Sequence, residues 1–263
     1  MNEELENQLD AIRQNVKEKN LDHVHVNEGT EGYGKSALSL AMANYLDPDF
    51  DVESQVAFSG DDFRRKAKEL DQYKAIVLDE AEGLFASDHM TSENKKTVKF
   101  LRKCREKNLF IFINWPVFQE IDRKIRKHRV KSMARTVQQG RAFVYNKSKV
   151  DRIVRNSYGK GSYPDPFMVA RWSDPEDSMA KVWSSYQDKK MDQIEELEEE
   201  ESGEDDGVEW LTPSEFGDLV GYSAKTVRKK IKDGDIQAYK RGDDFILKES
   251  EKEKLIEEYN PEQ

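Results

Sequence analysis

Apolar residues recur along the first two thirds of the chain in two alternating patterns. Short runs rich in Val, Ile and Phe predict β-strands at residues 23–26, 55–60, 73–81 and 109–115. Stretches with the three- and four-residue spacing of amphipathic helices lie between them, at residues 35–46, 61–70 and 92–108. Such strands, interleaved with helices, predict an α/β fold whose mainly parallel sheet is covered on both faces.

The pattern changes on either side of this alternating region. Residues 1–19 predict an amphipathic helix that packs on the domain or on a neighbouring subunit. Residues 117–128 have helical spacing, and residues 130–148 predict a β-hairpin at the edge of the sheet, with its turn at Gln139–Gly140. Residues 156–175, rich in Gly and Pro, predict irregular chain before a further helix.

Four segments follow from these patterns: the N-terminal helix (1–19), an α/β domain (20–190), a linker (191–209) and a small C-terminal domain (210–263). Within the linker, residues 195–209 hold ten acidic residues and no base. A run of this kind buries too little apolar surface to offset its ordering entropy, so we expect a disordered tether. A second possibility is a nucleic-acid mimic that covers a basic face when DNA is absent.

Composition excludes several classes of protein. The 263 residues contain no apolar run of the roughly 20 residues that crossing a membrane requires, and no secretory signal begins the chain. With Cys104 as the single cysteine, a disulfide framework and a thiolate metal cluster are excluded. We expect a soluble, cytoplasmic protein without a membrane span.

Charge is distributed unevenly. Residues 95–160 carry 20 bases and 4 acids, whereas residues 1–94 carry 9 bases and 21 acids. A basic block inside an otherwise balanced chain is typical of proteins that bind phosphates, because every neutralised phosphate releases condensed counterions. The alternative is that the block pairs with the acidic first third, within one subunit or across a subunit interface.

The residues after the first predicted strand match the phosphate-binding motif G-x-x-x-x-G-K-[ST]. They lie between a strand and a helix, which is the context that the motif requires, and they are Gly29, Thr30, Glu31, Gly32, Tyr33, Gly34, Lys35 and Ser36. The glycines allow the backbone amides to approach the phosphates. Lys35 is expected to neutralise the β- and γ-phosphates, and Ser36 to place its hydroxyl on Mg²⁺. The pattern predicts binding of ATP with Mg²⁺.

Two carboxylates complete the predicted site. The apolar strand at residues 75–78 ends in Asp79 and Glu80. We assign Asp79 to the Mg²⁺ shell and Glu80 as the general base that activates water, which favours hydrolysis over a pure binding switch. Glu82 is a weaker candidate for a site residue. Asn114, at the end of the next strand, is expected near the γ-phosphate, where it would sense phosphate or water.

A multimeric motor also needs an arginine that reaches the γ-phosphate of a neighbouring subunit. The candidates are Arg102, Arg105, Arg126 and Arg135, and the sequence alone does not choose among them. The four histidines show no metal-ligand spacing, and Cys104 is expected to be packed in a helix.

Together, these motifs resemble the FtsK/HerA-type and zonula-occludens-toxin-like ATPases over roughly residues 20–150. The resemblance rests on GTEGYGKS, on the strand ending in Asp79–Glu80, on LFIFINWP, on the segment Ile121–Arg126 and on the hairpin. It implies a P-loop motor ATPase of the additional-strand, catalytic-glutamate class, a class often carried by viruses and plasmids. The toxin-like members usually carry a membrane span, which this sequence lacks.

The C-terminal domain resembles the excisionase/MerR-type winged helix-turn-helix. Thr212 and Ser223 are expected to cap its two helices, the second at residues 224–232, and residues 236–239 and 245–247 to form the wing. We place Lys225, Thr226, Arg228, Lys229 and Arg241 near DNA. The alternative is a helix-turn-helix that binds protein.

The leading hypothesis is an ATPase of a virus or mobile element that acts on double-stranded DNA as a homo-oligomer, either a ring or a DNA-templated assembly. Moving or packaging DNA, stimulated by DNA and aided by virion or replication proteins, follows from the resemblance alone. The alternatives are an ATP-switched, sequence-specific regulator or replication initiator, and a non-enzymatic DNA-binding adaptor.

Overall fold

The computed structural model describes the chain except residues 80–91, 157–162, 204–209, 234–237, 242–243 and 249–263. It divides into two compact units, Met1–Lys190 and Met191–Gln263. Within the described residues, no helix has the length and apolar composition needed to cross a membrane.

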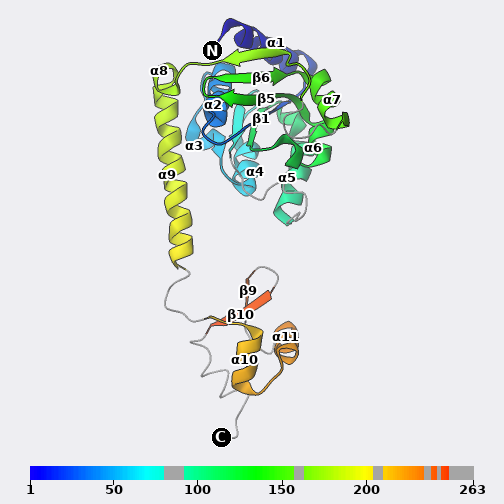
Figure 1. Cartoon of the computed structure of the whole chain (residues 1–263), viewed down its shortest axis with the longest axis vertical. Helices are drawn as coiled ribbons and strands as arrows, with labels where there is room; N and C mark the ends of the chain where they lie inside the picture. Colours follow the sequence, from blue (N-terminus) through cyan, green and yellow to red (C-terminus); the bar gives the residue numbers. More distant parts are fainter. Residues whose placement is uncertain (80–91, 157–162, 204–209, 234–237, 242–243, 249–263) are drawn as a thin grey trace. The chain divides into compact units, whose positions relative to one another are not determined.

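A seven-stranded sheet forms the centre of the first unit (Figure 1). In chain order its strands are β1 (His23–Glu28), β2 (Val56–Ala57), β3 (Ala75–Leu78), β4 (Phe110–Trp115), β5 (Val130–Gln138), β6 (Arg141–Tyr145) and β7 (Met168–Arg171). The spatial order is β2-β3-β4-β1-β5-β6-β7, and the pairs from β2 to β5 are parallel, while β5–β6 and β6–β7 are antiparallel. The predicted α/β class and mainly parallel sheet are confirmed.

Helices cover both faces of this sheet, and each face has its own apolar core (Figure 1). One core contains buried residues of α4 (Gly60–Glu69), α5 (Ser92–Lys103), α6 (Arg123–His128) and α7 (Lys147–Asn156). The other contains buried residues of α1 (Glu3–Lys19), α2 (Lys35–Leu46) and α3 (Val52–Gln55), together with Tyr186 of α9 (Ala180–Gly203). Burial on two faces explains why the strands are nearly continuous apolar runs.

The N-terminal helix packs on its own domain. α1 buries Leu5, Leu9, Ile12 and Val16, the residues whose spacing predicted the helix. Its first turn is also tied to the far end of the sheet, because the backbone N–H of Asn2 donates to the carbonyl of Arg171 in β7 at 2.9 Å.

The hairpin was expected at the sheet edge, and this placement is wrong. β5 and β6 do form a hairpin around Gly140, but β7 pairs with β6 and is the outer strand. β7 lies in the stretch that was expected to be irregular, and α8 (Pro175–Ser178) begins at the last residue of that stretch. Met168 and Ala170 are buried, so packing against the second core supports a strand that the flanking prolines conceal in the sequence.

Three other predicted segments differ in extent. The strand expected at 55–60 has only the two residues of β2, because Ser59 caps α4 by accepting a hydrogen bond from the N–H of Asp62. The helix expected at 117–128 is broken into the 3-10 turn η2 (Phe118–Glu120) and α6, because Asp122 caps α6. The helix expected at 92–108 ends as the 3-10 turn η1 (Cys104–Lys107).

The acidic linker is also more ordered than expected, since α9 continues through residues 191–203. Glu and Leu have high helix propensity, and a helix already anchored at residues 180–190 extends at low cost. Residues 204–209 lie outside the described residues.

The described part of the second unit contains the end of α9, two further helices and a small sheet. α10 (Pro213–Val220) and α11 (Ala224–Asp233) flank a turn at Gly221, whose φ is 74°. β8 (Trp210–Leu211), β9 (Tyr239–Arg241) and β10 (Asp244–Lys248) form a sheet of order β8-β10-β9, in which β8 was not predicted and β9 begins later than expected. Phe216, Val227 and Leu247 form its buried core.

Candidate functional site

The predicted phosphate-binding loop, residues 29–36, follows the carboxyl end of β1 and leads into α2. Gly29 and Gly34 have φ values of 142° and 84°. A Cβ atom on Gly29 would lie 2.1 Å from Oγ1 of Thr136 in β5, and one on Gly34 would lie 3.2 Å from the ring of Trp172. Both positions therefore need glycine, for backbone conformation and for close approach. The first turn of α2 holds no acidic residue, so its N–H groups and helix dipole favour an anion.

Lys35 is folded into this loop. Its side chain is buried, and Nζ donates a hydrogen bond to the backbone carbonyl of Gly29 at 2.8 Å. The ammonium group is thus held against the first residue of the loop, where it can neutralise phosphate oxygens that the loop encloses. Ser36 follows in the first turn of α2 and is partly exposed.

Asp79 lies directly after β3, and its side chain is fully buried. Oδ1 accepts a hydrogen bond from Nδ2 of Asn114 at 2.8 Å, and Oδ2 accepts one from the hydroxyl of Tyr186 at 2.5 Å. Asn114 belongs to the neighbouring strand β4, and Tyr186 belongs to α9. The structure therefore joins two predicted residues, Asp79 and Asn114, and adds a tyrosine from the end of the first unit.

A chain of hydrogen bonds continues from Asn114 into the interior. The Ser39 hydroxyl donates to Oδ1 of Asn114 at 2.5 Å and accepts from Nδ2 of Asn27 at 2.6 Å. Oδ1 of Asn27 lies 3.0 Å from Nε2 of His25, whose Nδ1 lies 2.7 Å from the Ser132 hydroxyl. Since the Asn27 oxygen can only accept, His25 Nε2 donates and Nδ1 accepts. This series of donors fixes the orientation of the Asn114 amide.

His25 is neutral in this arrangement. Burial lowers its pKa to about 4, and the hydrogen bond with Asn27 opposes this shift. His23 lies 2.7 Å from the same Ser132 hydroxyl, and its pKa is also lowered, by burial and by the neighbouring His25 and Lys131. Both histidines are thus structural hydrogen-bonding groups.

The donor set suits Mg²⁺ bound together with a nucleotide. Mg²⁺ in such sites keeps several waters and takes one or two protein oxygens plus phosphate oxygens. Ser36 and Asp79 can supply those protein oxygens. In the part of the chain that the structure describes, no group of three or more His, Cys, Asp or Glu side chains could hold a metal by itself. Glu80 and Glu82 lie outside the described residues, so the assignment of Glu80 as general base stays a prediction.

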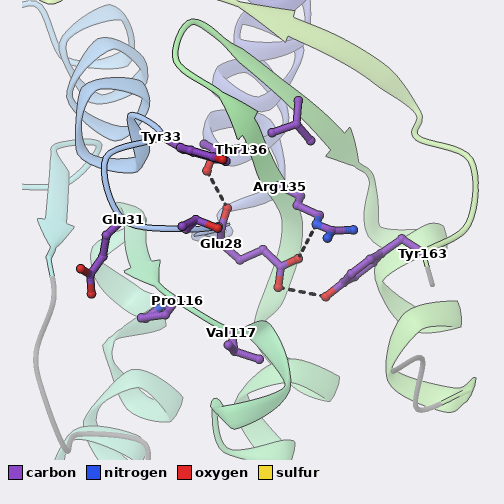
Figure 2. A pocket seen from close by; sticks show the side chains of 11 residues that line it. Glu28, Glu31, Tyr33, Pro116, Val117, Arg135, Thr136 and Tyr163 are labelled. Carbon is purple, nitrogen blue, oxygen red and sulfur yellow. Dashed lines mark hydrogen bonds and ion pairs between the residues drawn. The ribbon is translucent and has the colours of Figure 1, made fainter. Parts of the chain in front are cut away.

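A cavity of about 520 Å³ adjoins the loop (Figure 2). Loop residues Thr30, Glu31 and Tyr33 line it, facing a cluster of Glu28, Arg135 and Tyr163. Oε2 of Glu28 accepts hydrogen bonds from the backbone N–H of Phe118 and the Tyr163 hydroxyl, each at 2.9 Å. Burial raises the pKa of the Glu28 carboxyl, although these bonds and Arg135 oppose the shift.

The arginine-finger candidates differ in their surroundings. Arg135 Nε lies 3.7 Å from Oε1 of Glu28, and its guanidinium stacks over the Tyr163 ring at 4.8 Å, so Arg135 is occupied within its own chain. Arg126 is half-buried, and its Nε donates to the carbonyl of Ile121 at 2.8 Å. Arg105 is exposed, and the side chain of Arg102 lies outside the described residues. Of the four, the structure leaves Arg105 as the described candidate most accessible to a neighbouring subunit.

The basic block splits into paired and exposed residues. Arg129 is buried and forms an ion pair with Asp22, and Arg135 pairs with Glu28, so part of the block does neutralise the acidic first third of the same chain. Exposed bases remain on α6, namely Arg123, Lys124 and Lys127. Cys104 is buried as expected, and burial raises the pKa of its thiol to about 11.

The predicted caps of the second unit are present. The Thr212 side chain accepts from the N–H of Glu215, whose carboxylate accepts from the N–H of Thr212 in return, and Ser223 Oγ accepts from the N–H of Thr226. Lys225, Arg228 and Lys229 are exposed on α11. Arg241 lies in β9, and its side chain is outside the described residues.

Sequence reasoning missed Tyr186, Ser39, Asn27 and His25. The signal for three of them was present, because His25 and Asn27 are polar residues within an apolar strand and Ser39 lies one turn after Ser36 on an apolar helix. No local signal marks Tyr186, which is separated from Asp79 by 107 positions.

Comparisons with known proteins add little to this geometry. No protein-family model and no curated protein matches the chain. Among solved structures, the chain is similar to the N-terminal domain of zonular occludens toxin from Neisseria meningitidis, with 16% identity and a TM-score of 0.36 over 59% of this chain and 96% of that one.

Proposed function

We propose that this chain binds ATP together with Mg²⁺ and hydrolyses it to ADP and phosphate. The observation that carries the proposal is the contact between Asp79 and Asn114, in a chain whose glycine loop holds the Lys35 ammonium against its first residue. A buried carboxylate at the end of one strand and an oriented amide at the end of the next are what a P-loop site uses to hold the metal shell and the γ-phosphate.

Each residue has a distinct role in this proposal. Lys35 and the loop amides bind the phosphates, while Ser36 and Asp79 hold Mg²⁺, which polarises the γ-phosphoryl group when it is bound. Asn114 donates a hydrogen bond to Asp79, and in this proposal its amide senses the γ-phosphate or the attacking water. Glu80 accepts the proton of the attacking water.

Steady-state ATP hydrolysis tests the proposal. We expect Lys35→Ala to abolish nucleotide binding, and Glu80→Gln to keep binding while turnover falls by about 10² to 10⁴-fold, the usual contribution of a general base. The matched control is Glu82→Gln, which removes a carboxylate two positions away and should keep most of the activity. Equal hydrolysis in the wild-type, Lys35→Ala and Glu80→Gln proteins would contradict the proposal.

The proposal includes a DNA-binding role for the second unit, as a winged helix-turn-helix. Support comes from the capped helices on either side of Gly221 and from the exposed bases Lys225, Arg228 and Lys229 on α11. In this proposal α11 enters the major groove of duplex DNA, and the hairpin of β9 and β10 forms the wing. The P-loop unit assembles as a homo-oligomer that moves or packages DNA of a virus or mobile element.

An ATP-switched DNA-binding regulator or replication initiator is the second candidate. The hydrogen bond from Tyr186 to Asp79 favours it, because α9, which carries Tyr186, continues past Lys190 to Gly203. Measuring hydrolysis with and without long duplex DNA separates the two candidates. A motor requires stimulation by DNA of any sequence, whereas a switch requires ATP-dependent protection of one site and slow turnover. For a non-enzymatic adaptor, Lys35→Ala would leave DNA binding unchanged.

A further inference from the structure

We propose that Tyr186 is a positioning residue of the metal site, and that it couples Mg²⁺ binding at Asp79 to the docking of α9. This inference rests on the proposed function, since it concerns the same Mg²⁺·nucleotide site. It adds a residue from the last helix of the first unit, outside the phosphate loop and its neighbouring strands.

The contact is between buried groups. The Tyr186 hydroxyl donates to Oδ2 of Asp79 at 2.5 Å, the Tyr186 residue is 3% exposed, and Asp79 is 0% exposed. A hydrogen bond to a buried carboxylate is among the stronger ones in proteins. Asn114 holds the other oxygen, Oδ1, so the two donors together fix the plane of the carboxylate.

These two hydrogen bonds do not use the full acceptor capacity of the Asp79 carboxylate. A carboxylate presents about four lone-pair sites, and Tyr186 and Asn114 use two of them. The remaining sites can accept hydrogen bonds from Mg²⁺-bound water or ligate the ion directly. Tyr186 therefore orients Asp79 for the metal without replacing the metal ligands.

The helix that carries Tyr186 is anchored around this contact. The Tyr186 ring stacks on Trp183 at 5.4 Å between centroids. It also lies 6.0 Å from the ring of Phe58, which follows β2. One turn later, Nζ of Lys189 donates to the backbone carbonyl of Glu53 at 2.8 Å and lies 3.1 Å from its carboxylate. The hydroxyl of Tyr186 is thus the link between a docked helix segment, residues 180–190, and the metal site.

The effects of helix docking and Mg²⁺ binding on each other must be equal, because thermodynamic linkage is reciprocal. If docking of residues 180–190 orients Asp79 and so increases Mg²⁺ affinity, then Mg²⁺ must stabilise the docked segment by the same factor. Because α9 continues to Gly203, Mg²⁺ binding at Asp79 is linked to a helix that extends beyond Lys190 into the acidic run.

The test uses the full-length chain and mant-ADP, a fluorescent ADP analogue, titrated with Mg²⁺. We expect Tyr186→Phe, which keeps the ring packing, to raise the Mg²⁺ concentration for half-maximal mant-ADP binding roughly tenfold. The matched control is Tyr45→Phe, which removes a tyrosine hydroxyl 3.1 Å from Asp10 on α1 and should leave the Mg²⁺ midpoint unchanged. Hydrogen exchange of residues 180–190 is the second measurement. It should slow when Mg²⁺ is added to the wild-type protein with ADP, and should not slow in Tyr186→Phe.

The outcomes separate the inference from the proposed function. If the wild-type protein binds mant-ADP without any dependence on Mg²⁺, the proposed metal site fails and the inference fails with it. If the wild-type protein requires Mg²⁺ but Tyr186→Phe has the same midpoint and the same exchange response, the metal site stands and Tyr186 only packs. Should Tyr186→Phe not fold, the wild-type exchange experiment decides, because no effect of Mg²⁺ on residues 180–190 overturns the coupling.

Discussion

The amide nitrogen of Asn114 donates a hydrogen bond to Oδ1 of Asp79 at 2.8 Å. The pairing of β3 with β4 produces this contact, because Leu78 is in register with Ile113 and the next residue on each strand is Asp79 or Asn114. A strand end alone does not orient an amide, however. The Ser39 hydroxyl on α2 does so by donating to Oδ1 of Asn114, which turns Nδ2 toward Asp79.

The first prediction concerns Ser39. Ser39→Ala removes a donor to Asn114 and an acceptor for Asn27 at a fully buried position, so both amides lose a partner. We expect the free energy of unfolding, measured in urea, to fall by about 1–3 kcal/mol for each group left unsatisfied, and ATP turnover to fall with it. The control is Ser54→Ala, an exposed serine whose hydroxyl contacts Asp51. Equal free energies of unfolding for the two variants would show that the buried hydrogen bonds of Ser39 contribute nothing to stability.

The second prediction compares two glycines of the loop. A Cβ on Gly29 would lie 2.1 Å from Oγ1 and 2.8 Å from the backbone oxygen of Thr136, whereas a Cβ on Gly32 meets nothing within 4 Å. Gly29→Ala should therefore lower the free energy of unfolding by at least about 1–3 kcal/mol from overpacking, in addition to backbone strain. Gly32→Ala should lower the free energy of unfolding only by the backbone strain of a left-handed residue, about 1–2 kcal/mol, because Gly32 has a φ of 76°. Chemical denaturation of both variants measures the difference, and a larger loss for Gly32→Ala would contradict the close approach of Thr136.

The hydrophobic pattern and the motifs of the sequence predict the parallel part of the sheet and the residues at its carboxyl edge. The alternation of strands and helices predicts the parallel half of the sheet, since strands buried on both faces must be apolar throughout. The glycine loop and the carboxylate after β3 are recognisable because each occupies a fixed place relative to a strand. The position of Asn114 could be predicted for the same reason.

Tertiary contacts account for what the pattern missed. β7 has four residues and follows a segment rich in Gly and Pro, so only its pairing with β6 identifies it as a strand. Tyr186 looks like an ordinary apolar position of a helix, and its role depends on a fold that brings it to Asp79. Disorder was expected for the linker, but the structure continues α9 through residues 191–203, because a docked helix segment extends into the acidic run.

The third prediction concerns pH. The pKa of His25 in the folded protein is lowered from 6.5 to about 4 by burial. Between these values the unfolded chain binds the extra proton, so the free energy of unfolding falls as the pH drops from about 6.5 toward 4, by up to about 1.4 kcal/mol per pH unit for one group. Above pH 6.5 this histidine contributes no pH dependence.

His25→Gln provides the comparison, because glutamine can still donate to Asn27 but does not titrate. Urea unfolding between pH 4.5 and 6.5 should show a shallower slope for the variant than for the wild-type protein. The buried carboxyl of Glu28 titrates in both proteins, so its contribution largely cancels in the difference. Loss of His25 also removes one cause of the lowered pKa of His23, which makes the slope of the variant shallower still. Parallel slopes would mean that His25 does not titrate with an altered pKa.

The fourth prediction concerns DNA binding by α11, where Lys229 is exposed. A lysine that neutralises one phosphate contributes about 0.9 to the slope of log affinity against log salt concentration, because it releases condensed counterions. Lys229→Ala should therefore weaken binding to a mixed-sequence duplex and reduce this slope by about 1, as measured by fluorescence anisotropy at several salt concentrations. Lys19→Ala is the control, since Lys19 is an exposed base at the end of α1 that bonds to Asn15. If both variants keep the wild-type slope, Lys229 makes no phosphate contact, and the alternative that this helix pair binds protein is favoured. A loss confined to Lys229→Ala would assign the charge of α11 to the DNA backbone, and would leave sequence selection to the side chains nearer its start, such as Lys225 and Thr226.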